Sequence, residues 1–195
     1  QAWLNPLLVS IVSLIGILSL LKIPYAQFKE GTSAIAMMLT PATCVLAIPM
    51  VNQRKILKQN LTAILIGTFL GALTSILSVT FLCRILGLND LITRSLLPKS
   101  VTTPIAVSVC EGNGGLPAVT VTAVIFTGIL GSIVIPLLFH KLKIKNSVAL
   151  GITMGTASHA MGTSKAIEIG EQEGGLAGLA IGITGIFTVI LSLFL

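Results

Sequence analysis

The chain has 195 residues, of which 54% are hydrophobic and only 9% are charged, and its mean hydropathy is +1.02. A soluble domain carries roughly a quarter charged residues, so this chain has too few charges to cover a soluble core, and lipid is its expected solvent. The net charge of +6 does not indicate nucleic-acid binding, because the basic residues form short clusters between apolar runs and only 5% of residues are aromatic.

Uncharged stretches of about the length that crosses a bilayer predict an all-α integral membrane protein. In chain order they are residues 3–21, 31–53, 59–83, 112–140, 146–164 and 174–195. Trp3 and Tyr25 are expected at the membrane interface. Because the chain begins with Gln1 rather than Met, the question of whether a further helix precedes it stays open.

Two segments differ from these stretches because helix-breaking residues interrupt them. Residues 95–110 contain Pro98 and Pro104, and residues 155–170 contain Gly155 and Gly162. Proline removes a backbone donor and breaks a helix, and glycine weakens one. Irregular backbone at membrane depth is tolerated only where protein or a watery cavity satisfies it. Both segments are therefore expected to be interrupted or re-entrant helices beside a site.

The two segments occupy corresponding places in an internal repeat. Residues 61–118 align without gaps over 121–178, with fourteen identities in fifty-eight positions. The sequence thus predicts three parts: N-terminal transmembrane helices and a basic loop (1–58), a first repeat (59–118) and a second repeat (119–195). Transporters place substrate sites where such repeats meet, so we expect a helical bundle with the interrupted segments at the repeat interface.

The basic clusters favour inversion of the two repeats. Arg54, Lys55 and Lys58 precede the first repeat, and a second cluster, Lys141 to Lys145, follows the stretch 112–140. Both clusters lie on one side of the membrane if the segment 95–110 dips in and returns, and the positive-inside rule favours that arrangement. Each repeat then makes an odd number of crossings.

Polar side chains gather in both interrupted segments. Lys99 aligns with His159 in the repeat, and Thr103 aligns with Thr163. Hydroxyl donors and a positive charge are what a small carboxylate needs, so a substrate site is expected here. The candidate substrate-binding residues are Lys99, Ser100, Thr102, Thr103, Asn113, Ser158, His159 and Thr163.

Each of these residues also has a structural interpretation. Serine and threonine can bond helix carbonyls, and Lys99 can reach a headgroup. His159 can be a hydrogen-bonded core imidazole, or it can carry a coupled proton, because imidazole titrates near neutral pH. Glu111 and Glu171 are repeat equivalents that either mark solvated helix ends or serve as a gate or proton carrier.

Enzyme chemistry has no support in the sequence. The chain contains no GxSxG, HExxH, GxxxxGK[ST] or dinucleotide fingerprint, and its three cysteines form no CxxC pair. We expect a protein that is not an enzyme and that has no cofactor and no metal site.

The segments PKSVTTPIA and GTASHAMGT, together with TPATCVLAIP, resemble the LrgB/CidB family of membrane proteins over about residues 35–195. The resemblance implies a bacterial plasma (inner) membrane protein that acts with a small LrgA/CidA-type membrane partner. Some relatives carry glycolate, glycerate or pyruvate, and others are described as holin/antiholin-like controllers of murein hydrolase export and lysis.

Three functions therefore compete. The first is a secondary transporter of small 2-hydroxy or 2-oxo monocarboxylates such as glycolate, glycerate or pyruvate, working by alternating access. The second is a holin/antiholin-like regulator of murein hydrolase export that assembles, including with copies of itself. The third is a scaffold that only anchors a partner. The two matched polar motifs favour transport, because a non-selective pore has little need of them.

Overall fold

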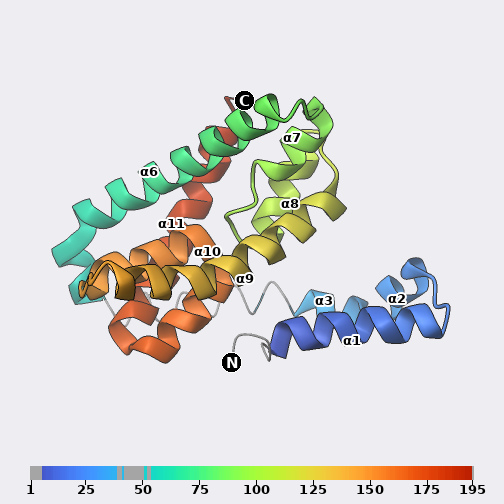
Figure 1. The fold of residues 1–195 in the computed structure, drawn as a ribbon, viewed down its shortest axis with the longest axis horizontal. Coiled ribbons are helices and arrows are strands. Elements are labelled where there is room, and N and C mark those ends of the chain that lie inside the picture. Colours follow the sequence, from blue (N-terminus) through green and yellow to red (C-terminus); the bar gives the residue numbers. More distant parts are fainter. Residues whose placement is uncertain (1–5, 39–40, 42–50, 52–53, 195) are drawn as a thin grey trace. The chain divides into compact units, whose positions relative to one another are not determined.

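The computed structural model describes residues 6–38, 41, 51 and 54–194, and every regular element among them is an α-helix (Figure 1). The chain forms two compact units, Gln1–Val45 and Leu46–Leu195. The smaller unit contains α1 (Pro6–Leu20), α2 (Tyr25–Gly31) and α3 (Ser33–Met37). The expectation for Trp3 and most of that for residues 31–53 fall outside the described residues.

The larger unit contains six described helices, and it holds both interrupted segments. They are α6 (Arg54–Ile85), α7 (Asp90–Leu96), α8 (Thr103–Gly112), α9 (Pro117–Lys141), α10 (Ser147–Ile169) and α11 (Glu171–Ser192). Within the described residues, three segments are long and apolar enough to cross a membrane: Lys58–Ile85, Pro117–Lys141 and Glu171–Ser192. The all-α membrane class predicted from composition is thereby supported.

The start of α9 differs from the uncharged stretch that predicted it. The stretch begins at Gly112, but the helix begins only at Pro117, after a turn in which Gly114 has φ +71°. Glycine adopts this left-handed conformation without a steric penalty, and proline suits the first turn of a helix because its missing N–H has no helical partner there. Local turn chemistry therefore sets this boundary.

Both predicted segments contain an interruption, and the two interruptions lie at equivalent positions of the repeat. In the first, α7 ends at Leu96 and α8 begins at Thr103, so Lys99 lies in the non-helical link. In the second, α10 continues through a single non-helical residue, His159, with φ +41° and ψ −134°. Whether these segments re-enter the membrane stays a prediction.

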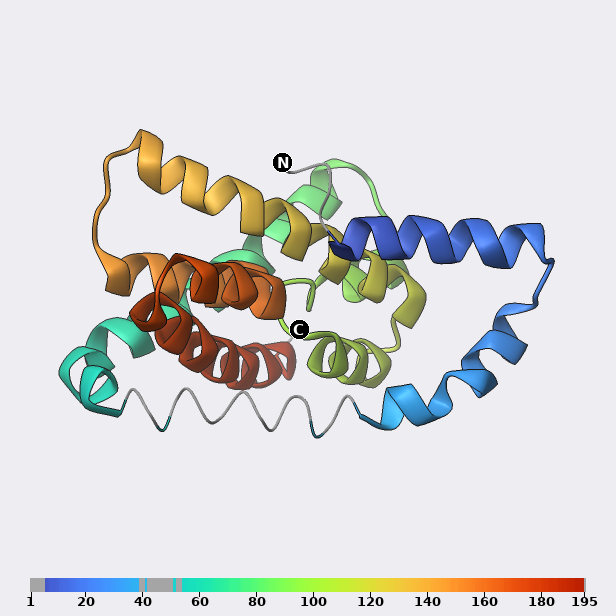
Figure 2. The ribbon, with the colours of Figure 1, turned by 90° about the horizontal axis from the view of Figure 1, so that it is seen from below.

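Helices α6 and α9 run in opposite directions in both ribbon views (Figures 1 and 2). Helix α10 packs against α9, α6 and most extensively α11, while α9 also packs against α7 and α8. The opposed directions are those that an inverted repeat would have. Inversion across the membrane nevertheless stays a prediction, because the direction of the helices alone does not place the membrane surfaces.

Glycines allow the close approach of α10 and α11. A Cβ atom added at Gly155 would collide with the backbone carbonyl of Ala177, and one added at Gly174 would lie 2.9 Å from the Cα of Ile167. Small residues at helix contacts are the usual way to bring backbones together in membranes. The glycines therefore fix how α10 lies, and with it the position of the break at His159.

We predict that Gly155→Ala destabilises the protein, because the added methyl group forces α10 and α11 apart at a cost of about 1–3 kcal/mol. Gly112→Ala is the matched control, since a Cβ there meets nothing within 4 Å. The apparent melting temperature in detergent, followed by size-exclusion chromatography after heating, should fall by several degrees for Gly155→Ala and stay level for Gly112→Ala. Equal melting temperatures would contradict the proposed packing.

Candidate functional site

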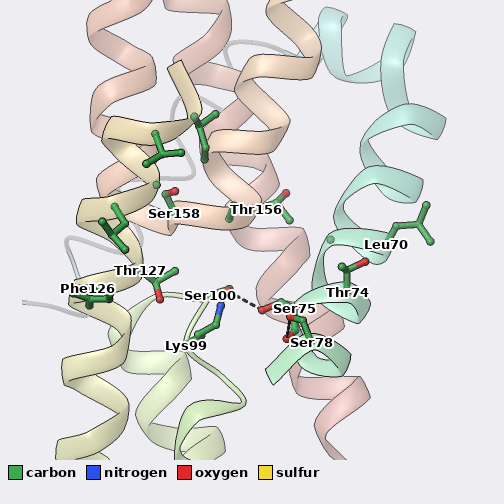
Figure 3. A pocket seen from close by; sticks show the side chains of 16 residues that line it. Leu70, Thr74, Ser75, Ser78, Lys99, Ser100, Phe126, Thr127, Thr156 and Ser158 are labelled. Atoms are coloured by element: carbon green, nitrogen blue, oxygen red, sulfur yellow. Dashed lines mark hydrogen bonds between the residues drawn. The ribbon is translucent and has the colours of Figure 1, made fainter. Parts of the chain in front are cut away.

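A cavity of about 820 Å³ lies in the larger unit between α6, α9, α10 and the link from α7 to α8 (Figure 3). Its apolar lining includes Leu70, Phe126, Leu130 and Val134. The polar side chains that line it are Thr74, Ser75 and Ser78 of α6, Lys99 and Ser100 of the link, Thr127 of α9, and Thr156 and Ser158 of α10. An apolar pocket with a few polar groups is the usual form of a small-molecule site.

Corresponding positions of the two predicted repeats line the cavity. Four pairs of positions sixty residues apart, one member on α6 and one on α9, line it together: 70 and 130, 71 and 131, 74 and 134, and 75 and 135. Corresponding faces of the two repeats therefore enclose the same space. This is the location at which duplicated transporters place their substrate.

Repeat-equivalent glycines hold the first half of α10 between α6 and α9. A Cβ at Gly71 would collide with the side chain of Thr156, and a Cβ at Gly131 would collide with that of Ser158. Thr156 also accepts a hydrogen bond from Thr184 of α11, at 3.3 Å. These contacts bring the residues just before the break at His159 to the wall of the cavity.

A chain of hydrogen bonds connects the link to α6. The Lys99 ammonium donates to Ser100 Oγ at 3.1 Å, and Ser100 Oγ lies 2.7 Å from Ser75 Oγ. The two serines together have two hydroxyl hydrogens, and the bond between them uses only one. Whichever serine donates, one hydroxyl hydrogen remains available to a ligand in the cavity.

The charge of Lys99 has no acidic partner in the described part of the chain. Lys165 forms an ion pair with Glu168, and both residues lie on the second half of α10. No aspartate or glutamate is among the residues that line the cavity. A half-buried ammonium in an apolar cavity without a counter-charge makes the site electropositive, and an anion is the ligand that it favours.

Four buried side-chain atoms in the described residues have no hydrogen-bond partner, and all four belong to residues that the sequence singled out. They are Thr102 Oγ1, Asn113 Nδ2, Ser158 Oγ and Thr163 Oγ1. A buried polar atom without a partner costs about 1–3 kcal/mol, and each such atom in a native protein requires an explanation. Ser158, which lines the cavity, is positioned to bond a ligand there.

His159 is buried and does not line the cavity. Its Nε2 lies 2.9 Å from the carbonyl oxygen of Val124 in α9, and the ring packs against Gly128. Since a carbonyl only accepts, Nε2 must carry a hydrogen and donate it. This bond agrees with the structural interpretation of His159, and a substrate or proton-coupling role for it stays a prediction.

The remaining candidates lie apart from the cavity lining. Thr102, Thr103 and Thr163 flank the two interruptions without lining the cavity. Asn113 lies in a separate, smaller cavity of about 380 Å³, where its carbonyl accepts a bond from Arg94. The other two are exposed: Glu111 lies near the end of α8, and Glu171 lies at the start of α11. The structure thus brings together Lys99, Ser100 and Ser158 from the candidate set.

Sequence reasoning missed the contributions of α6 and α9. Ser75 and Ser78 follow Gly71 at helical spacing and therefore share one face of α6. That polar stripe in an apolar span was a detectable signal, as was the alignment of Gly71 with Gly131. Thr127 is the one hydroxyl of α9 in the described cavity lining, and no pattern in the sequence distinguishes it from a packing residue, whereas Thr156 lies two residues before Ser158 in the second interrupted segment.

The long apolar helices of the described chain define an α-helical integral membrane protein. The LrgB-like family matches residues 1–195, and the chain belongs to this family. It is 35% identical to the protein YwbG of Bacillus subtilis, over 100% of this chain and 87% of that one. It is 33% identical to antiholin-like proteins LrgB of Bacillus cereus and Bacillus anthracis, over 95% of this chain and 81% of theirs. No solved structure matches.

The backbone of His159 gives a sharp stability prediction. At φ +41° the residue adopts a conformation that glycine prefers, whereas within a regular helix glycine is about 1 kcal/mol less favourable than alanine. We expect His159→Gly to be more stable than His159→Ala, which reverses the usual order. At Ser164, an exposed helical position of α10, the alanine variant should be the more stable. Melting temperatures of the four variants test this, and the ordinary order at both positions would show that residue 159 is helical.

Proposed function

We propose that this protein is a secondary transporter of small monocarboxylates, 2-hydroxy or 2-oxo acids such as glycolate, glycerate or pyruvate. The observation that carries the proposal is the ammonium group of Lys99, which lines a cavity with no acidic side chain. The free serine hydrogen of the Ser75–Ser100 pair supplies a second donor, and Ser158 supplies a third from the facing helix. A carboxylate accepts several such bonds, and its charge neutralises Lys99.

Alternating access fits the position of the cavity. Because the walls of the cavity come from corresponding faces of two repeats, a tilt of one repeat against the other opens it toward one side or the other. The Ser75–Ser100 bond joins α6 to the first interruption, and the Gly131–Ser158 contact joins α9 to the second helix break. Each of these contacts lies within one repeat and would move with it, whereas the contact of Gly71 with Thr156 joins the two repeats and is the one that such a movement would change.

The remaining parts of the proposal come from the family. We propose a bacterial plasma membrane location, assembly with an LrgA/CidA-type small membrane protein or with further copies of the chain, and no enzymatic activity. The surrounding lipid bilayer accounts for the exposed apolar side chains of the spanning helices, such as Phe81 and Leu137.

Uptake into proteoliposomes tests the transport function. Lys99→Gln should raise the half-saturating concentration of radiolabelled glycolate, glycerate or pyruvate about 10- to 100-fold, since a charge-assisted bond contributes about 1.5–3 kcal/mol. Lys165→Gln is the matched control, because its ammonium pairs with Glu168 away from the cavity. Identical uptake by the two variants would show that Lys99 does not belong to the substrate site. Absence of saturable uptake by the unaltered protein would overturn the transport function.

The second candidate function is the holin/antiholin-like control of murein hydrolase export. It is favoured by the names of the similar Bacillus proteins. A pore that admits proteins is wider than one helical bundle, so it would form from several copies of the chain and would not depend on the chemistry of the cavity within one copy. The two functions therefore differ in what passes through the membrane and in their response to Lys99→Gln.

Dye release separates the two candidates. If the protein is a selective transporter, liposomes that contain it should retain carboxyfluorescein and fluorescent dextran while they accumulate a small carboxylate. Release of both dyes at rates that depend steeply on protein density, with no change in Lys99→Gln, would favour the pore. Protein-free liposomes that have been through the same reconstitution are the control.

A further inference from the structure

The mouth of the large cavity is mostly apolar and lies on the exposed surface of two spanning helices. Four large apolar side chains of its lining are exposed on the larger unit, Leu70 at 51%, Phe126 at 64%, Leu130 at 45% and Val134 at 50%, and the lining residues Thr74 and Ser78 of α6 are exposed as well. By contrast, Ser100 and Ser158, which line the same cavity, are 7% and 0% exposed. The rim between α6 and α9 is therefore mostly apolar, and the serine hydroxyl that Lys99 bonds is buried.

This rim lies near the middle of both spans. At about 1.5 Å per residue, Leu130 lies about 20 Å from the start of α9 at Pro117 and about 16 Å from its end at Lys141. Leu70 likewise lies about 18 Å from Lys58, where the apolar span of α6 begins. Since the hydrocarbon core of a bilayer is about 30 Å thick, the rim faces lipid tails rather than water or headgroups.

The cavity is also larger than a small acid requires. An acid with about six non-hydrogen atoms fills less than about 180 Å³, even if each atom takes the ~30 Å³ of a water molecule in the liquid. The cavity holds about 820 Å³, which is in the upper part of the range of about 300–1,000 Å³ that accommodates drug-sized ligands. A small carboxylate at Lys99 therefore leaves most of the apolar part of the cavity unfilled.

From the electropositive interior, the apolar rim and the volume, we infer that the cavity also binds a single-chain amphiphile with an anionic head, such as a long-chain carboxylate. The head lies at Lys99 and Ser100, and the chain passes over Leu130 and Phe126 into the lipid. This inference rests on the anion site of the proposed function and extends its ligands to a second class. The amphiphile and a small carboxylate compete for Lys99.

Electron paramagnetic resonance with a nitroxide-labelled stearate tests the inference. The protein is reconstituted in phosphatidylcholine in mildly alkaline buffer, where carboxyl groups are ionised. The labelled acid should show a motionally restricted fraction severalfold larger than that of its uncharged methyl ester. Lys99→Gln should reduce the motionally restricted fraction of the acid to that of the ester, and Lys165→Gln should leave the fraction of the acid unchanged. Equal fractions for acid and ester in the unaltered protein, as expected if another helix covers the mouth, overturn the inference.

A second pair of variants tests the mouth itself. Leu130→Trp narrows the mouth and should lower the excess of the restricted fraction of the acid over that of the ester. Leu138 is an exposed leucine of α9 that does not line the cavity, so Leu138→Trp should leave this excess unchanged. Equal effects of the two tryptophans would place the amphiphile elsewhere and overturn the inference.

Uptake of labelled small carboxylates by the same proteoliposomes separates this inference from the proposed function. If small carboxylates are taken up but the acid shows no larger restricted fraction than the ester, the amphiphile site is refuted and transport is not. If the acid shows a larger restricted fraction that depends on Lys99 but no small carboxylate is taken up, transport is refuted and the amphiphile site is not.

Discussion

The backbone of a membrane helix cannot be interrupted where it faces lipid, because its freed N–H and C=O groups would have no partners there. Among the described helices of the larger unit, the backbone is interrupted at the link that holds Lys99 and at His159, and α6 has a kink at Asn60 near its start. The rest of that unit supports the breaks. The glycine contacts of α10 with α6, α9 and α11 hold one break in place, and α9 packs against both helices that flank the other.

The same constraint explains why polar atoms collect beside an apolar cavity. Residues that break helices leave room for hydroxyl and ammonium groups, and one buried hydroxyl of the cavity lining, that of Ser158, has no hydrogen-bond partner. Such atoms lower stability unless a ligand satisfies them, so stability and function conflict at this site. An anion that neutralises Lys99 relieves part of that conflict, whether it is a short acid or the head of an amphiphile.

Much of the fold was predictable because membrane helices can be identified in the sequence from their apolar composition. Three spans agree with uncharged stretches of the sequence, and both interruptions lie in the segments that proline and glycine marked. Boundaries such as the start of α9 at Pro117 were less accurate, since they depend on turn geometry. For the candidate site, the sequence singled out Lys99, Ser100 and Ser158, which line the cavity, because ionisable and polar residues are rare in such a chain, but it did not single out Ser75.

The sequence by itself determined the class of protein, the duplication and the two places where the helices break, because each follows from local chemistry or from comparison of the chain with itself. Only the tertiary structure decided which candidates share a cavity. It brings Lys99, Ser100 and Ser158 to one cavity with Ser75, turns His159 toward the Val124 carbonyl, and leaves Asn113 in a separate cavity. The reason is that the direction of a side chain at a helix break depends on how closely the neighbouring helices approach, and glycine contacts between distant segments set that approach.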